Sequence, residues 1–302
     1  MTKKKPRLFS VDDLLYAVED EDFSLVKKII RSGINPDIEN KYGDRVLYEA
    51  AKICNDEILN FLIDHCTEVN FVNDEYNKTV LWYSVFGDNI KAVQKLINKG
   101  VDLDSAPLCG LYSGITPLHI ALQLNEIDIA KTLIKAGADV NGTTRTESLL
   151  EIAVKKNLPC VVKEMLKHSE INEEKQSISL LEALCSLGLV DEVKRLLEQG
   201  VDPNTPLGEQ INKSPLDCAI KFNRTEVALL LIEAGANVNF ISGFNNKSLL
   251  WFAIAQDNEK LVKTLLLKGA DPNIVLAKAI DEGNIEIINS PYAKVEKIGQ
   301  IL

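Results

Sequence analysis

The sequence predicts an all-α solenoid, in which short helix-turn-helix units stack one on another. Two observations predict this fold. A residue pattern recurs about every 33 residues along most of the 302-residue chain, and within each copy the apolar residues recur at helical spacing in two short stretches. A single pair of such short helices would expose one apolar face to water, so successive pairs are expected to cover one another.

The period is visible at the residue expected to end the second helix of each unit. These residues are Gly33, Cys66, Gly100, Gly137, Ser169, Gly200, Gly235 and Gly269. The intervals between them are 33, 34, 37, 32, 31, 35 and 34 residues. With Thr116 taken as position 1 of its unit, they all fall at position 22. Glycine is favoured there because a helix commonly ends in a left-handed residue.

Other positions of the unit carry residues suited to caps and turns. Position 1 holds hydroxyl residues that can cap the first helix, such as Thr116, Ser148, Ser179, Ser214 and Ser248. Position 10, between the two helices, is Gly, Asn or Asp in seven units, namely Asp88, Asn125, Asn157, Gly188, Asn223, Asp257 and Gly283. These types tolerate a positive φ best, so a tight turn is predicted there. Small alanine at position 6 lets neighbouring helices approach closely.

Three units carry a recognisable motif. TPLHIALQLN at Thr116–Asn125, followed by GADVN at Gly137–Asn141, resembles the ankyrin repeat, whose signature begins T-P-L-H and whose period is about 33 residues. SPLDCAIKFN with AGANVN and SLLWFAIAQD with KGADPN also match, and the other units match by spacing and apolar pattern. The resemblance covers about Asp12–Asn289. It implies an all-α ankyrin-repeat solenoid with β-hairpin-like connecting loops.

Laid along the chain, the pattern predicts a single ankyrin-repeat solenoid over residues 1–302 with about nine units. The units are residues 12–37 (N-terminal cap unit), 45–70, 79–104, 116–141, 148–172, 179–204, 214–239, 248–273 and 274–290 (truncated C-terminal cap unit), and residues 291–302 form a tail. Terminal units depart from the pattern because each needs one polar outer face. Cys66 and Ser169 replace glycine at position 22, which predicts altered helix ends in the second and fifth units.

The net charge of −10 is unevenly placed. Residues 11–75 carry six Lys or Arg against sixteen Asp or Glu. Because such an acidic first quarter would repel phosphates, no nucleic-acid partner is expected. The basic stretch KKKPR at residues 3–7 is interpreted as a solubilising end. No apolar run approaches the roughly 18 residues that a membrane span needs.

The residues that often carry chemistry have structural interpretations. Six cysteines lie at long spacings without a C-x-x-C pair, which is typical of reduced, buried thiols in a cytoplasmic protein rather than of disulfides or a zinc site. The resemblance assigns His119 a bond between neighbouring loops, and His65 and His168 stand where a cation suits a helix C-terminus. No cofactor, metal or catalytic constellation is expected, so the chain is predicted to be no enzyme.

The resemblance implies that partners bind the concave face, formed by the loop tips and the first helices, with positions 5, 8 and 9 at its surface. Several of these positions carry large apolar residues. Two aromatic clusters are predicted to anchor a partner, because such side chains bury much area at little entropic cost. The first comprises Tyr76, Tyr83, Phe86 and Tyr112, and the second Phe222, Phe244, Trp251 and Phe252. For Trp82 and Trp251, at position 4, packing between units is an equal alternative.

A second predicted binding feature is an acidic patch on the first units. It comprises Asp12, Asp13, Glu19, Asp20, Glu21 and Asp22, with Asp37 and Glu39 nearby. Such a patch would attract a basic partner surface and speed its encounter. Solvated helix ends are the alternative interpretation.

These observations predict a monomeric, cytoplasmic, non-enzymatic module that binds another protein through its concave face as an inhibitor, adaptor or immunity-type protein. Heavy use of Ile, Lys and Asn indicates an AT-rich genome, so a bacterial effector that binds a host protein in the host cytoplasm is an alternative. A further alternative is an enzyme with its site on the extended loops Ser105–Ile115 and Thr205–Lys213. Those loops and their flanks offer Asp104, Ser105, Cys109, Tyr112, Ser113, Glu209 and Lys213.

Overall fold

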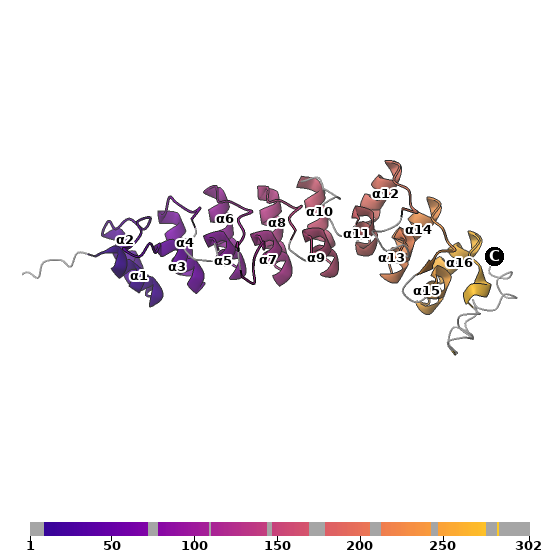
Figure 1. The fold of residues 1–302 in the computed structure, drawn as a ribbon, viewed down its shortest axis with the longest axis horizontal. Coiled ribbons are helices and arrows are strands. Elements are labelled where there is room, and N and C mark those ends of the chain that lie inside the picture. Colours follow the sequence, from indigo (N-terminus) through magenta and orange to yellow (C-terminus); the bar gives the residue numbers. More distant parts are fainter. Residues whose placement is uncertain are drawn as a thin grey trace, which may run out of the picture. The chain divides into compact units, whose positions relative to one another are not determined.

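The computed structural model describes residues 9–71, 78–108, 110–143, 147–168, 179–205, 213–242, 247–275 and 283. The chain forms two compact bodies. The N-terminal body comprises Met1–Lys156 and Cys160–Lys175, and the C-terminal body comprises Asn157–Pro159 and Gln176–Leu302. Both are built from consecutive pairs of short helices (Figure 1).

Two layers of helices make up the N-terminal body. Its helices are α1 (Val11–Glu19), α2 (Phe23–Arg31), α3 (Val46–Ile53), α4 (Asp56–His65), α5 (Val80–Phe86), α6 (Ile90–Asn98), α7 (Pro117–Leu124), α8 (Ile127–Ala136), α9 (Leu149–Lys155) and α10 (Pro159–His168). The first helices of successive units, α1, α3, α5, α7 and α9, pack side by side. The second helices α2, α4, α6 and α8 do the same in the other layer.

The C-terminal body repeats this arrangement. Its helices are α11 (Leu180–Leu187), α12 (Val190–Glu198), α13 (Pro215–Lys221), α14 (Thr225–Glu233), α15 (Leu249–Ala255) and α16 (Glu259–Leu267). A short antiparallel hairpin, β1 (Ile241–Ser242) with β2 (Lys247–Ser248), precedes α15. In the N-terminal body a single bridge joins Thr143 to Ser148 at the matching place before α9. The predicted all-α repeat solenoid is confirmed within each body.

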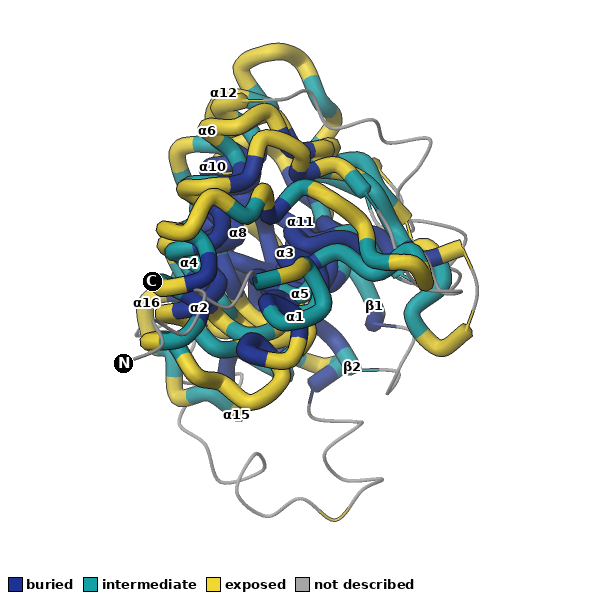
Figure 2. The backbone as a smooth tube through the Cα atoms, turned by 90° about the vertical axis from the view of Figure 1, so that its left-hand side faces the viewer, coloured by how far each residue is buried: buried dark blue, intermediate teal, exposed yellow. Residues whose placement is uncertain are grey.

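The core lies between the helices. In Figure 2 the buried positions lie where helices face one another, whereas many turns are exposed. Alanine at position 6 is buried in six units, as Ala17, Ala50, Ala121, Ala153, Ala219 and Ala253. These small side chains allow the first helices to approach closely, so that leucine, isoleucine and valine side chains on either side interlock. Each large apolar side chain buried in this way contributes roughly 1.5–3 kcal/mol.

The turn and the caps were largely predictable. Position 10 has a positive φ, between 52° and 77°, in all nine units, at Glu21, Cys54, Asp88, Asn125, Asn157, Gly188, Asn223, Asp257 and Gly283. Sequence reasoning identified seven of them and missed Glu21 and Cys54, whose residue types do not favour this conformation. The five predicted hydroxyl caps each accept a hydrogen bond from the backbone N–H three residues on.

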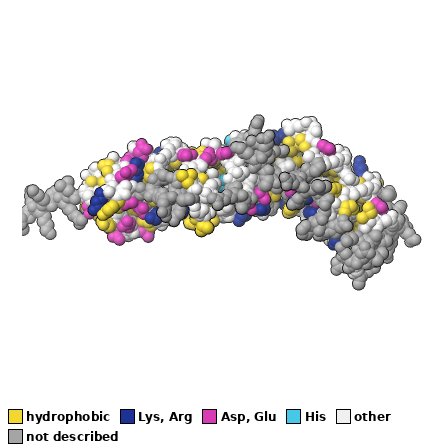
Figure 3. Space-filling model, in the orientation of Figure 1, with side chains coloured by type: hydrophobic (Ala, Val, Ile, Leu, Met, Phe, Trp, Pro, Cys, Tyr) yellow, Lys and Arg dark blue, Asp and Glu magenta, His cyan; other side chains and the backbone are white. Residues whose placement is uncertain are grey.

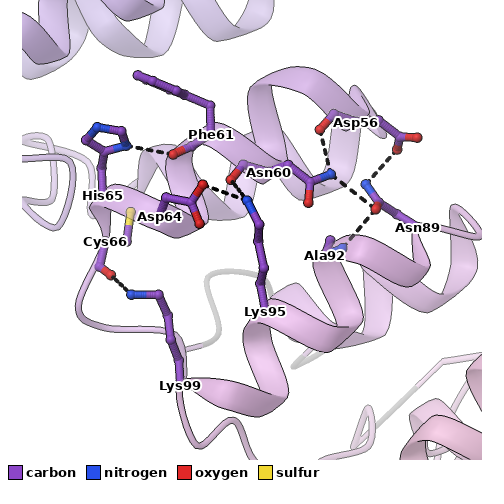
Figure 4. A network of polar contacts seen from close by, with 10 residues as sticks. All are labelled: Asp56, Asn60, Phe61, Asp64, His65, Cys66, Asn89, Ala92, Lys95 and Lys99. Carbon is purple, nitrogen blue, oxygen red and sulfur yellow. Dashed lines mark hydrogen bonds and ion pairs between the residues drawn. The ribbon is translucent and has the colours of Figure 1, made fainter.

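Cys66 changes the end of α4, as its residue type predicts. The backbone of Cys66 is extended, with φ at −88°, in place of the left-handed glycine of other units. Its carbonyl oxygen accepts a hydrogen bond of 2.7 Å from the Lys99 ammonium of the next unit (Figure 4). A lysine from α6 therefore satisfies a carbonyl group at this helix end. Ser169, the other exception, lies outside the described residues.

Polar side chains also join α4 to α6 (Figure 4). The Asn89 side-chain oxygen caps α6 by accepting from the backbone N–H of Ala92 at 2.9 Å, and its amide donates to Asp56 at 2.6 Å. Lys95 donates to the Asp64 carboxylate at 2.6 Å and to the Asn60 carbonyl at 2.8 Å. This network fixes the distance between neighbouring second helices.

An asparagine at position 26 ties three of the described units to the next unit. The Asn70 amide donates to the Gly100 carbonyl at 3.0 Å, and its oxygen accepts from the backbone N–H of Asp102 at 2.7 Å. Asn204 and Asn239 make the same pair of bonds in the C-terminal body. An asparagine side chain has both a donor and an acceptor, so one residue satisfies two backbone groups about 30 residues away.

Replacing Asn70 with alanine is expected to lower the free energy of unfolding by about 1 kcal/mol, because two exposed inter-unit hydrogen bonds are lost. Asn70→Asp keeps the acceptor and should lose less. The control is Asn98→Ala, which changes an exposed asparagine at the end of α6. Urea denaturation measures the free energy of unfolding of all three variants. An equal loss in Asn70→Ala and Asn98→Ala would contradict a stabilising role for the inter-unit bonds of Asn70.

His119 has a structural role in its own unit. Its Nδ1 lies 2.8 Å from the Thr116 hydroxyl oxygen and accepts from the Thr116 backbone N–H at 3.3 Å. These bonds run within the unit, whereas the resemblance implied a bond between loops. The side chain is fully buried. Burial lowers the pKa of His119 to about 4, although the Asp139 carboxylate and the Gly142 backbone oppose this effect.

His119 should therefore make stability depend on pH. Its folded-state pKa lies below the unfolded value of about 6.5, so between these values the unfolded state binds a proton that the folded state does not. Stability then falls as the pH drops from about 6.5 toward 4. The difference in unfolding free energy between wild type and His119→Gln should shrink by about 3 kcal/mol between pH 7.5 and pH 4. A constant difference, measured by urea denaturation across this range, would contradict the shifted pKa.

Candidate protein-binding surface

The first predicted aromatic cluster assembles around Trp82 on α5. The Trp82 ring meets Tyr83 edge-on at a centroid distance of 5.3 Å and Tyr112 edge-on at 5.0 Å. Phe86 stacks on it at 5.4 Å with an interplanar angle of 12°. The structure thus brings together three of the four residues predicted for this cluster. Tyr76, the fourth, lies outside the described residues.

The four rings of this cluster differ in how much of their surface is exposed to solvent. Trp82 is fully buried, Tyr83 and Tyr112 are half-buried, and Phe86 is 45% exposed. Trp82 therefore packs between units, which was one of the two roles considered for it, the other being contact with a partner. Its buried ring supports the more exposed rings around it. Phe86 is the ring that this cluster presents to solvent.

Cation–π contacts of Lys78 link the loop before α7 to helix α5. Its ammonium nitrogen lies 4.7 Å from the centroid of the Trp82 ring, 5.5 Å from that of Tyr83 and 5.0 Å from that of Tyr112. Attraction between a cation and aromatic faces contributes roughly 0.5–1 kcal/mol at partly exposed sites. The Lys78 ammonium thus contacts two rings of α5 and the Tyr112 ring of the loop before α7. These shared contacts hold Tyr112 against α5.

The loop that carries Tyr112 adds exposed aliphatic side chains. Leu108 and Leu111 are both strongly exposed, and the loop is closed by a 2.9 Å hydrogen bond from the Gly114 N–H to the Pro107 carbonyl. We call Phe86, Leu108, Leu111 and Tyr112 the α5–loop surface. The two leucines were missed by the sequence analysis, although an extra-long loop containing LCGLY was a usable signal.

The second predicted cluster is only partly assembled. Trp251 and Phe252, both half-buried on α15, meet edge-on at 5.3 Å, and the Lys247 ammonium lies 3.5 Å from the Trp251 centroid. Phe222, at the end of α13, is 54% exposed and makes no ring contact with them within the described residues. Phe244 lies outside those residues. Phe222 is therefore a separate exposed anchor.

Position 5 is less exposed than predicted. Ile120, Ala183 and Cys218 are buried there, because the first helices pack against one another through this position. Tyr16 on α1 is the exception, with 66% of its surface exposed. The exposed apolar side chains of the other first helices are Phe86, Leu124 and Phe222 at positions 8 and 9.

Half of the predicted acidic patch serves local structure. Asp13 accepts from the Ser10 backbone N–H in a capping box, Asp22 caps α2, and Glu21 accepts from the Asn55 amide at 2.8 Å. Asp12, Glu19 and Asp20 have no such bond within the described residues. Figure 3 shows Asp and Glu side chains gathered near the N-terminal end of the described chain.

Asp37 and Glu39 also have structural partners. Glu39 pairs with Arg45 at 2.7 Å. Asp37 accepts hydrogen bonds from the backbone N–H and hydroxyl of Thr67 in the next unit. Burial opposes ionisation of Asp37, but the bonds from Thr67 and Glu68 outweigh it and lower its pKa. Among the described contacts of these acidic residues, only that of Glu39 is with a cation, because the described groups that donate to Asp13, Glu21, Asp22 and Asp37 are neutral.

Two of the residues considered for chemistry have structural partners, since Asp104 accepts from the Asp139 backbone N–H at 2.9 Å and Lys213 pairs with Glu182 at 3.6 Å. Within the described part of the chain, no three His, Cys, Asp or Glu side chains are placed to hold a metal ion. Burial raises the pKa of Cys218 to about 12, and it also raises those of Cys66 and Cys185, so these thiols stay protonated. Cys109 and Glu209 of the extended loops lie outside the described residues. Among described helices, none has the length and apolar composition to cross a bilayer.

Stacked pairs of short helices with exposed side chains on their first helices and loops define a helical repeat protein. Family models described as ankyrin repeats match residues 14–107 and 149–242 as three-copy arrays, and residues 113–145 and 245–275 as single repeats. The chain therefore belongs to the ankyrin-repeat family, whose members generally serve as protein–protein interaction modules.

Three similar proteins illustrate the range of relatives. "Ankyrin repeat and KH domain-containing protein mask-1" of Caenorhabditis elegans is 29% identical over 195 residues, 65% of this chain and 7% of the worm protein. "Putative ankyrin repeat protein YahD" of Escherichia coli is 30% identical over 54% of this chain and 83% of its own length. "Putative ankyrin repeat protein FPV031" of fowlpox virus is 34% identical over 58% of this chain and 51% of its own length.

Truncating the buried and the exposed ring of the α5 cluster should have different effects on stability. Trp82→Ala is expected to lower the free energy of unfolding by about 3–5 kcal/mol, because it leaves a cavity between units. Phe86→Ala should cost less than about 1 kcal/mol, because much of its ring already faces water. Urea denaturation measures both. Equal losses would show that Phe86 belongs to the core and not to a binding surface.

Proposed function

We propose that this chain binds a partner protein through the α5–loop surface and acts as an inhibitor or adaptor by occupying the partner's surface. The observation that carries the proposal is the exposure of Phe86, which stacks on buried Trp82, and of Leu108 and Leu111 on the loop whose Tyr112 meets the same ring. Large apolar side chains kept in contact with water are typical of interfaces when they are grouped.

The fixed geometry of this surface supports the proposal. The rings of Tyr112 and Phe86 both contact Trp82, and Lys78 lies against three rings of the cluster. Side chains that are already ordered lose little entropy on binding, which leaves more of the contact energy for affinity. Phe222 on the C-terminal body supplies a further exposed anchor.

The acidic residues of the first unit support a basic partner surface, and the free cysteines support a cytoplasmic location. Asp12, Glu19 and Asp20 would favour a partner with a basic surface, because opposite charges speed encounter and orient the partner. The described cysteines are Cys54, Cys66, Cys160, Cys185 and Cys218, and all are free. Free thiols suit a reducing compartment, so we propose that the protein acts in the cytoplasm.

The test is a pull-down that compares wild type with the double variant Phe86→Ala/Leu111→Ala. The matched control is Leu267→Ala, which removes an exposed aliphatic side chain from the second helix α16. A specific partner should be captured equally by wild type and the control, and at least tenfold less by the double variant, because anchor residues often contribute about 2 kcal/mol or more each. Undiminished capture by the double variant would place the interface elsewhere, and equal loss in the control would indicate nonspecific apolar contact.

A further inference from the structure

A hollow of about 380 Å³ opens on the first two units of the N-terminal body. One side is the face of α1 that carries Asp12, Tyr16 and Glu19, which lie together because they are spaced four and three residues apart on a helix. The opposite side is the turn that carries Tyr42, and α3 contributes Glu49. The hollow is thus lined by two aromatic rings, by four carboxylates and by two lysines, and these charged residues are Asp12, Glu19, Asp44, Glu49, Lys41 and Lys52.

The rings of Tyr16 and Tyr42 are both largely exposed. Tyr16 is 66% exposed and Tyr42 75% exposed. Neither ring is committed to the core of the described body, so both faces of the hollow are available to an incoming side chain. Tyrosine at such a place offers an apolar ring with a polar tip, which is a frequent combination at interfaces.

The turn holds Tyr42 in a defined position. The Asn40 side-chain oxygen accepts from the backbone N–H groups of Tyr42 at 2.8 Å and Asp44 at 2.9 Å, and the Asn40 N–H donates to the Asp44 carbonyl at 3.0 Å. Gly43, with φ at +85°, allows the chain to reverse. Little ordering of the turn is therefore needed when a ligand binds.

The uncompensated charge in the hollow is negative. Glu49 pairs with Lys52 at 3.4 Å, whereas Asp12 and Glu19 make no hydrogen bond or ion pair with any described residue. The Lys41 ammonium lies 4.7 Å from the centroid of the Tyr42 ring, so a cation can lie against this ring in its present position. A group that fits must therefore be cationic at one end and able to pack against aromatic rings along its length.

We propose that the hollow receives an arginine side chain from a basic segment of the partner protein. The aliphatic stem and guanidinium plane pack against Tyr16 and Tyr42, and the guanidinium N–H groups donate to the carboxylates of Asp12 and Glu19. Arginine fits better than lysine because its planar group stacks on rings and donates in a fork. This inference rests on the proposed function, since it names the chemistry of the partner.

The test uses the full chain and a fluorescent peptide in which three arginines are separated by Gly-Ser pairs. The control peptide carries citrulline in place of arginine, which keeps the shape and removes the charge. Fluorescence anisotropy at low salt should show at least tenfold tighter binding of the arginine peptide. Equal affinity for both peptides, or no binding of either, would overturn the inference.

Protein variants locate the site. Tyr42→Ala should weaken binding of the arginine peptide about three- to fivefold, and Asp12→Asn/Glu19→Gln about tenfold. Glu57→Gln, which removes an exposed carboxylate from α4, should change it less than twofold. Thermal unfolding verifies that each variant stays folded. If the Tyr42 and carboxylate variants lost no more affinity for the peptide than Glu57→Gln, the binding would be general charge attraction, and the inference would be overturned.

The two proposals fail in distinguishable ways. If Phe86→Ala/Leu111→Ala abolishes partner capture while the Tyr42 and carboxylate variants bind partner and peptide normally, the hollow is not an arginine site and the proposed function stands. If the Tyr42 and carboxylate variants lose both partner and peptide while Phe86→Ala/Leu111→Ala binds normally, the arginine site stands and the α5–loop surface is not the interface.

Discussion

The structure depends on the burial of each helix pair's apolar face against the next pair. Helices of seven to ten residues are too short to be stable alone, so the contact between units supplies the stability that each unit lacks. That contact needs small side chains where first helices approach, which buried Ala50 and Ala121 provide. It also needs a fixed register, which the asparagine bonds between loops and the lysine and asparagine bonds between α4 and α6 provide.

The same constraint determines where a partner can be bound. Because first helices pack through position 5, side chains such as Ile120 and Cys218 are buried between units. What remains exposed are the ends of the first helices and the loops before them, where Phe86, Leu111 and Phe222 lie. Exposed side chains at such places can vary without disturbing the buried core.

Features set within one unit could be predicted from the sequence, and features set between units could not. Caps such as Thr116 and left-handed turns such as Asn125 follow from local residue type. Glu21 is an exception, because it adopts the same left-handed turn although its residue type does not favour it. The aromatic residues of the first cluster could be identified from the sequence. Whether a ring such as Trp82 is buried or exposed depends on contacts with residues about 30 positions away, such as Tyr112. The hollow between Tyr16 and Tyr42 was not predicted for the same reason.

The central claim is that the first helices and their loops, and not the second helices, contact the partner. Hydrogen–deuterium exchange of the free chain and of the chain bound to its captured partner tests it most directly. The account predicts slower exchange in residues 80–86 and 110–116 on binding, with α4 and α6 unchanged. Protection confined to α4 and α6, with the α5–loop surface unaffected, would contradict it.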